Sequence, residues 1–351
     1  MDNETDLKIE LISSEEDDSH LTDVHPYQLN TYGSDMTVEL LSKKIDDDEI
    51  HITPFQRNYV WPPKKASRLI ESFLLGLPVP QIFLFLEKDQ RYIVVDGQQR
   101  LRSINYFLNE KFPGDKPFKL VGVHEKWSNL TFSELKEEDQ RKLRNSILRS
   151  SIFEQSVPDD DTSIYQIFER LNTGGMPLNS QEIRNALTRG PINQFLIDVN
   201  KISSWRKLLG KADPDTRMKD VEMILRFFAL YEKRSKYTKS MAIFLNRYME
   251  ENREINEARQ SELKQLFISL IDYAYKKFGK NAFRIKSGFN VAVFDSVMIA
   301  LSATDLKKLK EPKRKLEMLK KDTEFLEYVS KHTTDSQVVL GRIRLAAKYL
   351  K

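Results

Sequence analysis

A β-rich run that passes through Asp-Gly directly into an amphipathic helix most restricts the fold of this chain. Residues 92–95 read Tyr-Ile-Val-Val, Asp96 and Gly97 follow, and the segment 98–108 repeats its apolar residues at helical spacing. A strand needs neighbours to pair with, and an amphipathic helix needs an apolar layer to cover. This segment therefore predicts a mixed α+β core.

Flanking segments extend the same pattern. The β-rich runs 81–87 and 91–95 are joined by three polar residues, which predicts a hairpin. Residues 66–75 form one apolar helix face, and residues 51–55 read as a short extended segment. A further strand is predicted at 118–123. The first half of the chain thus mixes strands and helices.

The second half is predicted to be helical. Apolar residues recur there at i, i+3, i+4 and i+7, and most of them are expected to be core: Ile164, Ile167, Phe168 and Leu171; Val221, Ile224, Leu225 and Phe228; Met241, Phe244, Leu245 and Tyr248; Leu263, Leu266, Phe267 and Leu270. A polar break at 155–162 marks the predicted boundary. We expect an acidic, disordered tail at 1–24, an α+β domain at 25–157 and a helical domain at 158–351.

Composition excludes several classes of function. The chain has no cysteine, which rules out disulfides and thiol chemistry. It also lacks any apolar run near the ~20 residues that span a bilayer, and residues 1–10 do not resemble a secretory signal. A cytoplasmic protein without a membrane partner is expected. Residues 301–351 hold 13 Lys/Arg against 7 Asp/Glu, which we interpret as a solvated helix face rather than a nucleic-acid surface.

The start of the helix at 98 is suited to binding phosphate. Its first N–H groups have no acceptor within the helix, and the helix dipole adds partial positive charge there. Glycine permits a tight turn or the close approach of a ligand, and two guanidinium groups match phosphate oxygens. The predicted phosphate-binding set is Gly97, Gln98, Gln99, Arg100 and Arg102. The alternative is that Asp96 merely caps the helix and Arg100 lies on the surface.

A second cluster, at 55–61, packs an arginine, two amides and three aromatic rings into seven residues. Such side chains can stack on a base and grip phosphate, so Arg57 and Tyr59 are candidates for contacting a nucleotide. Gln56 and Trp61 would support them. The alternative is a structural loop in which Tyr59 and Trp61 fill the core.

A third cluster, at 168–187, has the outline of two helices joined at Gly174-Gly175. Asn179 and Glu182 stand in capping-box positions at the start of the second helix. Capping leaves the other polar residues unexplained, and these are candidates for lining a site: Asn172, Thr173, Gly174, Gln181, Arg184 and Asn185. The second helix is not notably basic, which disfavours a DNA-reading module.

Together these segments resemble the N-terminal domain family of the GmrSD restriction endonucleases. The resemblance lies in Phe-Gln-Arg-Asn-Tyr-Val-Trp at 55–61, Val-Asp-Gly-Gln-Gln-Arg-Leu at 95–101 and Arg-Leu-Asn-Thr-Gly-Gly at 170–175, followed by the polar helix to 187. It covers roughly residues 28–230, and the joint match is highly specific.

The resemblance implies a ParB/sulfiredoxin-like fold, in which a Gly-Glu-Arg-Arg-type turn at a helix start holds nucleotide phosphates. Gln98 and Gln99 replace that turn's acidic and basic residues. Asp96 and Arg100 are then the expected catalytic residues, with Asp96 orienting the turn or holding a magnesium-bound water. Gln81 joins the supporting set. The expected cofactor is a nucleoside triphosphate, with Mg²⁺ as a further candidate.

The resemblance also implies nucleotide hydrolysis coupled to DNA cleavage in anti-phage restriction, with catalysis by positioning and charge neutralisation. The alternatives are a metal-dependent ParB-like nuclease that uses Asp96, and a non-catalytic DNA-binding or interaction module. The five histidines are scattered without HNH or zinc spacing. We therefore expect DNA and a separate nuclease or methylase as partners, and a homo-oligomer stays open.

Overall fold

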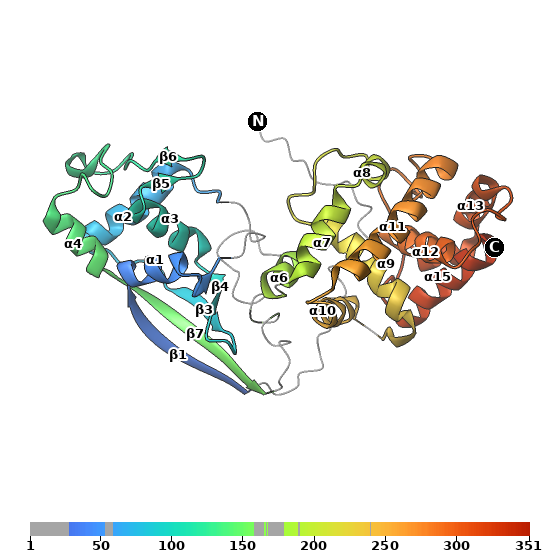
Figure 1. The fold of residues 1–351 in the computed structure, drawn as a ribbon, viewed down its shortest axis with the longest axis horizontal. Helices are drawn as coiled ribbons and strands as arrows, with labels where there is room; N and C mark the ends of the chain where they lie inside the picture. The colour runs from blue at the N-terminus through green and yellow to red at the C-terminus, as the bar shows by residue number, and fades with distance from the viewer. Residues whose placement is uncertain are drawn as a thin grey trace. The chain divides into compact units, whose positions relative to one another are not determined.

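The computed structural model describes residues 28–52, 59–157, 165, 167, 179–188, 190–238 and 240–351. Contacts group residues 24–187 and residues 188–351 into separate compact units. Figure 1 shows a sheet with helices in the first unit and helices alone in the second. The sequence predicted the boundary at residue 157, whereas helix α6 (Ser180–Leu187) belongs to the first unit.

The first unit contains a mixed five-stranded sheet in the order β1-β7-β3-β4-β2. The long antiparallel ribbon of β1 (Gln28–Thr37) and β7 (Ile147–Val157) forms one side. Strand β3 (Ile82–Leu86) pairs parallel with β7 and antiparallel with β4 (Tyr92–Asp96), and β2 (Ile50–His51) lies parallel to β4. The predicted hairpin and the α+β fold class are confirmed.

Strand β4 separates two apolar layers because successive side chains point to opposite faces of a sheet. Val94 joins the large cluster beneath the helices, whereas Ile93 and Val95 join Ile183 and Leu187 of α6 on the other face. The helices of the first layer are α1 (Val38–Asp46), α2 (Pro63–Leu75), α3 (Gln98–Leu108) and α4 (Glu137–Asn145). Helix α3 has the predicted bounds and begins where β4 ends.

Two details of the first unit lie beyond α3. A small hairpin, β5 (Lys111–Phe112) and β6 (Lys116–Pro117), follows the helix. The predicted strand at 118–123 was wrong, since no strand or ladder forms there. Phe118 and Leu120 are buried, but Gly122 has φ +68°, which breaks an extended run. The alternating burial of residues 118–120, which is typical of a strand, therefore occurs here in a segment without regular secondary structure.

The second unit is helical, as predicted. Its helices are α7 (Pro191–Asn200), α8 (Ser203–Leu209), α9 (Lys219–Lys233), η3 (Arg234–Lys236), α10 (Met241–Glu251), α11 (Glu257–Phe278), α12 (Val291–Ser302), α13 (Pro312–Lys321), α14 (Thr323–Tyr328) and α15 (Ser336–Tyr349). The stripes predicted on α9, α10 and α11 contribute to one core cluster. Within the described part of the chain, no helix has both the length and the apolar character needed to cross a bilayer.

Candidate functional site

The segment from Asp96 to Arg100, called the 96–100 turn below, joins β4 to α3. Gly97 has φ +101°, a conformation that side-chain-bearing residues rarely adopt. A Cβ atom at this position would lie 2.3 Å from Cγ2 of Ile82. Glycine is therefore required both by the backbone of the turn and by the close approach of the neighbouring strand, without reference to a ligand.

Asp96 does not cap α3, so the alternative that Asp96 serves only as the cap of this helix is wrong. Helix α3 has Gly97 at its N-cap and no side-chain hydrogen bond to its first N–H groups. The Asp96 carboxylate instead accepts a hydrogen bond of 2.9 Å from Nη2 of Arg100. The same nitrogen donates to the Gln81 carbonyl oxygen at 3.1 Å. Arg100 thus ties the turn to the start of β3, and the side chains of Asp96 and Arg100 stay 29% and 16% exposed.

Gln99 holds the chain that precedes α2. Its Oε1 accepts hydrogen bonds from the backbone N–H groups of Val60 and Trp61, at 3.0 and 3.3 Å. This side chain was predicted to donate to a ligand, but its carbonyl end acts here as a structural acceptor. Gln98, Gln99 and Arg100 are each half-buried, so protein atoms do not fully cover the start of the helix.

Tyr59 is packed against the same helix. Its hydroxyl lies 2.7 Å from Oγ of Ser103, and Ser103 donates to the Gln99 carbonyl. Its ring makes edge contacts with Tyr106 and Phe112. Burial raises the pKa of Tyr59 to about 12. This environment suits a residue that anchors the loop, and Ser103 is a member of the arrangement that the sequence did not single out.

Trp61 also packs against the first-unit core, and the Lys65 ammonium lies 4.6 Å from its ring centroid. Gln81, besides accepting from Arg100 through its backbone, accepts a 3.4 Å hydrogen bond from Ser151 through Oε1. Gln56 and Arg57 lie outside the described residues, so the structure does not place the predicted contacts of this loop.

Two guanidinium N–H groups near the turn donate no hydrogen bond to the described residues. Nε of Arg100 and Nε of Arg102 are buried and have no hydrogen-bond partner in the described part of the chain. Nη1 of Arg102 donates to the Tyr106 hydroxyl at 3.3 Å. A buried donor without an acceptor costs about 1–3 kcal/mol. This pair therefore lies beside a helix start that lacks a side-chain cap and has no acceptor among the described residues.

The polar residues of α6 form an internal network. Asn179 accepts from the N–H groups of Gln181 and Glu182, and Glu182 accepts from the N–H of Asn179 at 2.7 Å, which confirms the predicted capping box. Gln181 bonds to both Arg184 and Asn185. The side chains of Gln181, Glu182, Arg184 and Asn185 are at most 1% exposed. Asn172, Thr173 and Gly174 lie outside the described residues.

Asp96 is not brought together with the carboxylates at the tip of the hairpin. Asp89 pairs with Arg91 at the tip, whereas Asp96 is at the other end of the five-residue strand β4. Five residues of strand span roughly 17 Å. Among the described residues, no three His, Cys, Asp or Glu side chains form a group that could hold a metal ion.

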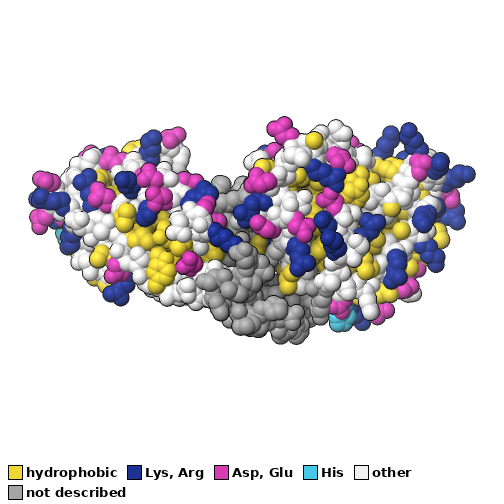
Figure 2. All heavy atoms as spheres, turned by 60° about the horizontal axis from the view of Figure 1, so that its bottom comes forward, with side chains coloured by type: hydrophobic (Ala, Val, Ile, Leu, Met, Phe, Trp, Pro, Cys, Tyr) yellow, Lys and Arg dark blue, Asp and Glu magenta, His cyan; other side chains and the backbone are white. Residues whose placement is uncertain are grey.

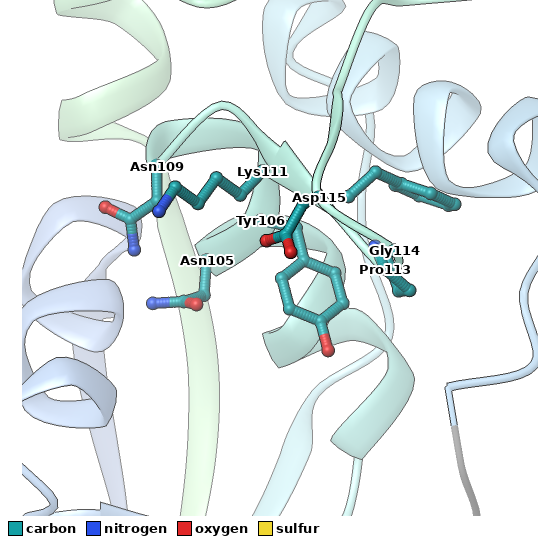
Figure 3. Close-up of a pocket in the computed structure, with 8 residues that line it drawn as sticks. Asn105, Tyr106, Asn109, Lys111, Pro113, Gly114 and Asp115 are labelled. Atoms are coloured by element: carbon teal, nitrogen blue, oxygen red, sulfur yellow. The ribbon is translucent and has the colours of Figure 1, made fainter.

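A shallow pocket of about 330 Å³ lies at the other end of α3, against the β5–β6 hairpin (Figure 3). Figure 3 shows Asn105, Asn109 and Lys111 toward one side of it. The amides of Asn105 and Asn109 donate to the Asp46 carboxylate at 2.7 and 3.1 Å. The amide donors of this wall are thus already engaged, and the hollow does not coincide with the 96–100 turn.

Comparison with known proteins relates most of the first unit to a known family. Residues 38–189 match the model of the GmrSD restriction endonuclease N-terminal domain. The search of curated proteins gave no match. The matched segment begins with α1 and includes the sheet strands β2, β3, β4 and β7, the 96–100 turn and α6. Residues 38–189 are therefore similar to the N-terminal domain of the GmrSD restriction endonucleases.

Proposed function

We propose that this chain is a nucleotide-binding, NTP-hydrolysing component of a DNA-restriction system, with the 96–100 turn as its phosphate site. The family match supports the restriction role. The ParB/sulfiredoxin-like relationship stays a prediction. The observation that carries the site is the pair of buried Nε donors on Arg100 and Arg102 beside a helix start without a side-chain cap.

Phosphate oxygens fit this environment. They accept charge-assisted hydrogen bonds, which are about twice as strong as neutral ones, and anions are favoured at helix N-termini. Both Nε atoms are shielded from water, so a phosphate would reach them only after side chains around the turn shift. Nucleotide binding would therefore accompany a local rearrangement of the turn.

Asp96 would change its role on binding. A phosphate that engages Arg100 competes with the Asp96 carboxylate for the same guanidinium. Mg²⁺ bound with a nucleotide usually takes one or two carboxylates together with phosphate oxygens and waters, and Asp96 is the carboxylate that the turn offers. Mg²⁺ would neutralise phosphate charge. Arg100 and Arg102 would orient the phosphates, and positioning with charge neutralisation would carry the catalysis.

The test is phosphate release with ATP, GTP, CTP and UTP, with and without Mg²⁺. Arg100→Ala and Asp96→Ala should each reduce release by at least ~10²-fold, the usual cost of removing a group that stabilises transition-state charge. The matched controls are Arg91→Ala and Asp89→Ala, because this pair has the same chemistry at the tip of the same hairpin. Equal release by the intact protein and both turn variants would remove the hydrolase claim.

A further inference from the structure

The two units differ in charge. Residues 24–187 contain 21 Lys/Arg and 23 Asp/Glu, whereas residues 188–351 contain 34 Lys/Arg and 20 Asp/Glu. The total of +4 therefore hides a strongly basic helical unit. On the face drawn in Figure 2, Lys and Arg side chains are spread over this unit with fewer acidic ones between them. Such an imbalance favours a polyanionic partner.

The basic residues concentrate where α11 ends. Residues 273–286 include five basic side chains and no acidic one: Lys276, Lys277, Lys280, Arg284 and Lys286. The four lysines are exposed, and Arg284 is half-buried. Asp272 is the acidic residue that precedes this stretch. Positive charge is thus uninterrupted over the last turn of a helix and the following loop.

Other elements add charge at the same place. Arg284 donates to the carbonyl oxygens of Leu208 and Leu209, both at 3.0 Å, which joins the loop to the end of α8. There, the ammonium of Lys207 lies 5.8 Å from the Tyr275 ring centroid. Lys320 of α13 donates to the Asn281 carbonyl at 2.7 Å. Burial lowers the pKa of Lys320, Glu317 opposes this, and Arg284 lowers it further.

Helix capping explains only part of this cluster. Carbonyl groups at helix C-termini attract cations, and Arg284 caps α8 in this way. Lys276, Lys277 and Lys280 differ, because their ammonium groups form no ion pair within the part of the chain that the structure describes. Exposed lysines on flexible stems act as point charges toward phosphates. Lys276 and Lys277 stand in the last turn of α11, where the helix dipole favours cations. Lys280 follows the helix, and the three exposed lysines together form a run of positive charge that suits a polyanion.

We infer that this surface binds the phosphate backbone of duplex DNA. The α11 basic surface is defined by Lys207, Lys276, Lys277, Lys280, Arg284 and Lys286. It lies outside the matched segment 38–189. The choice of DNA rests on the proposed restriction role, whereas the charge arrangement is independent of nucleotide hydrolysis. Backbone contacts position a protein on DNA without reading its sequence.

The test is fluorescence anisotropy of the full chain with a labelled duplex DNA of about 30 base pairs across a salt series, without nucleotide. The probe variant is Lys276→Gln/Lys277→Gln/Lys280→Gln. The control, Lys307→Gln/Lys308→Gln/Lys310→Gln, removes equal charge from exposed lysines of the same unit. Loss of three phosphate contacts should weaken binding at least ~10-fold and reduce the log–log salt slope by about 2–3, while the control changes little.

Phosphate release should be unchanged in the probe variant, which separates this inference from the proposed hydrolase. Three results would overturn it: no DNA binding by the intact protein at low salt, equal weakening in both variants, or binding to duplex RNA alone. Loss of hydrolysis in the turn variants with intact DNA binding would leave the α11 basic surface standing.

Discussion

Arg–Asp pairs occur in two contrasting settings in this molecule. In the first unit, Arg100 and Asp96 meet at 2.9 Å with both side chains partly exposed. In the helical unit, Asp295 is fully buried between Arg226 and Arg342, at 2.6 and 3.2 Å. The first pair sits where a helix begins, and the second group joins α9, α12 and α15. Similar side chains therefore stand in very different dielectric surroundings.

The difference shows which pair can change partners. Burial disfavours the charged form of both Arg226 and Arg342, but Asp295 outweighs it at Arg226 and raises that pKa. At Arg342 burial wins and lowers the pKa to about 10. Neither guanidinium could lose Asp295 without leaving an uncompensated buried charge. The pair at the 96–100 turn is partly open to solvent, so separating its two charges would cost less desolvation energy than separating the buried group around Asp295.

The largest effect is expected for Asp295→Ala. It leaves two buried guanidinium groups without their carboxylate, which should cost about 3–5 kcal/mol of unfolding free energy. Urea denaturation measures this. Asp305→Ala is the control, because Asp305 pairs with Lys308 on the surface at 3.3 Å. A loss below about 1 kcal/mol would show that the buried cluster does not need its central charge.

Gly97→Ala should follow, with a loss of about 2 kcal/mol or more, because it combines a positive φ with a Cβ placed against Ile82. Gly33→Ala is the matched control. A Cβ atom at residue 33 would have no neighbouring atom within 4 Å, and the φ of Gly33 is not positive. The free energy of unfolding should therefore change by no more than about 1 kcal/mol in Gly33→Ala. Thermal unfolding compares the two. Similar losses would contradict the explanation given for Gly97.

Tyr59→Phe tests the loop anchor through pH. Because the folded pKa is raised to about 12 from 10, the folded state holds the proton more tightly than the unfolded chain. The resulting contribution to the free energy of unfolding is at most about 2 kcal/mol. It is fully present below about pH 10 and is lost as the pH rises from about 10 to 12. Denaturation across this range should show a shallower decline for Tyr59→Phe. If stability fell equally with pH in the intact protein and in Tyr59→Phe, the raised pKa of Tyr59 would be refuted.

The smallest changes in stability are expected for substitutions of Arg91 and Arg100, which lie near opposite ends of β4. These two substitutions separate a structural role from a functional one. Arg91→Ala breaks an exposed pair and should change stability by less than about 0.5 kcal/mol. Arg100→Gln, which removes a partly buried pair and the bond to Gln81, should cost about 1 kcal/mol. Equilibrium denaturation is read beside phosphate release. If Arg100→Gln alters stability alone, Arg100 is a structural tie and not a phosphate ligand.

Local patterns predicted the elements whose signals are local. The helix 98–108 and the hairpin before it were read from periodicity and from the polar turn between the runs, and both formed as expected. The Asn179–Glu182 capping box was correct for the same reason, since its bonds join residues three apart. Apolar stripes on α9 and α11 identified core residues because a helix buries one face.

By itself, the sequence determined that a glycine-opened helix start with two arginines follows a strand. Only the tertiary structure decided what those groups touch: Ile82 against Gly97, the Gln81 carbonyl on Arg100, and Val60 and Trp61 on Gln99. It also buried Arg184, which the sequence proposed as a site lining. The physical reason is that hydrogen bonds and desolvation depend on neighbours distant in the chain, and strand order, which periodicity does not encode, selects those neighbours.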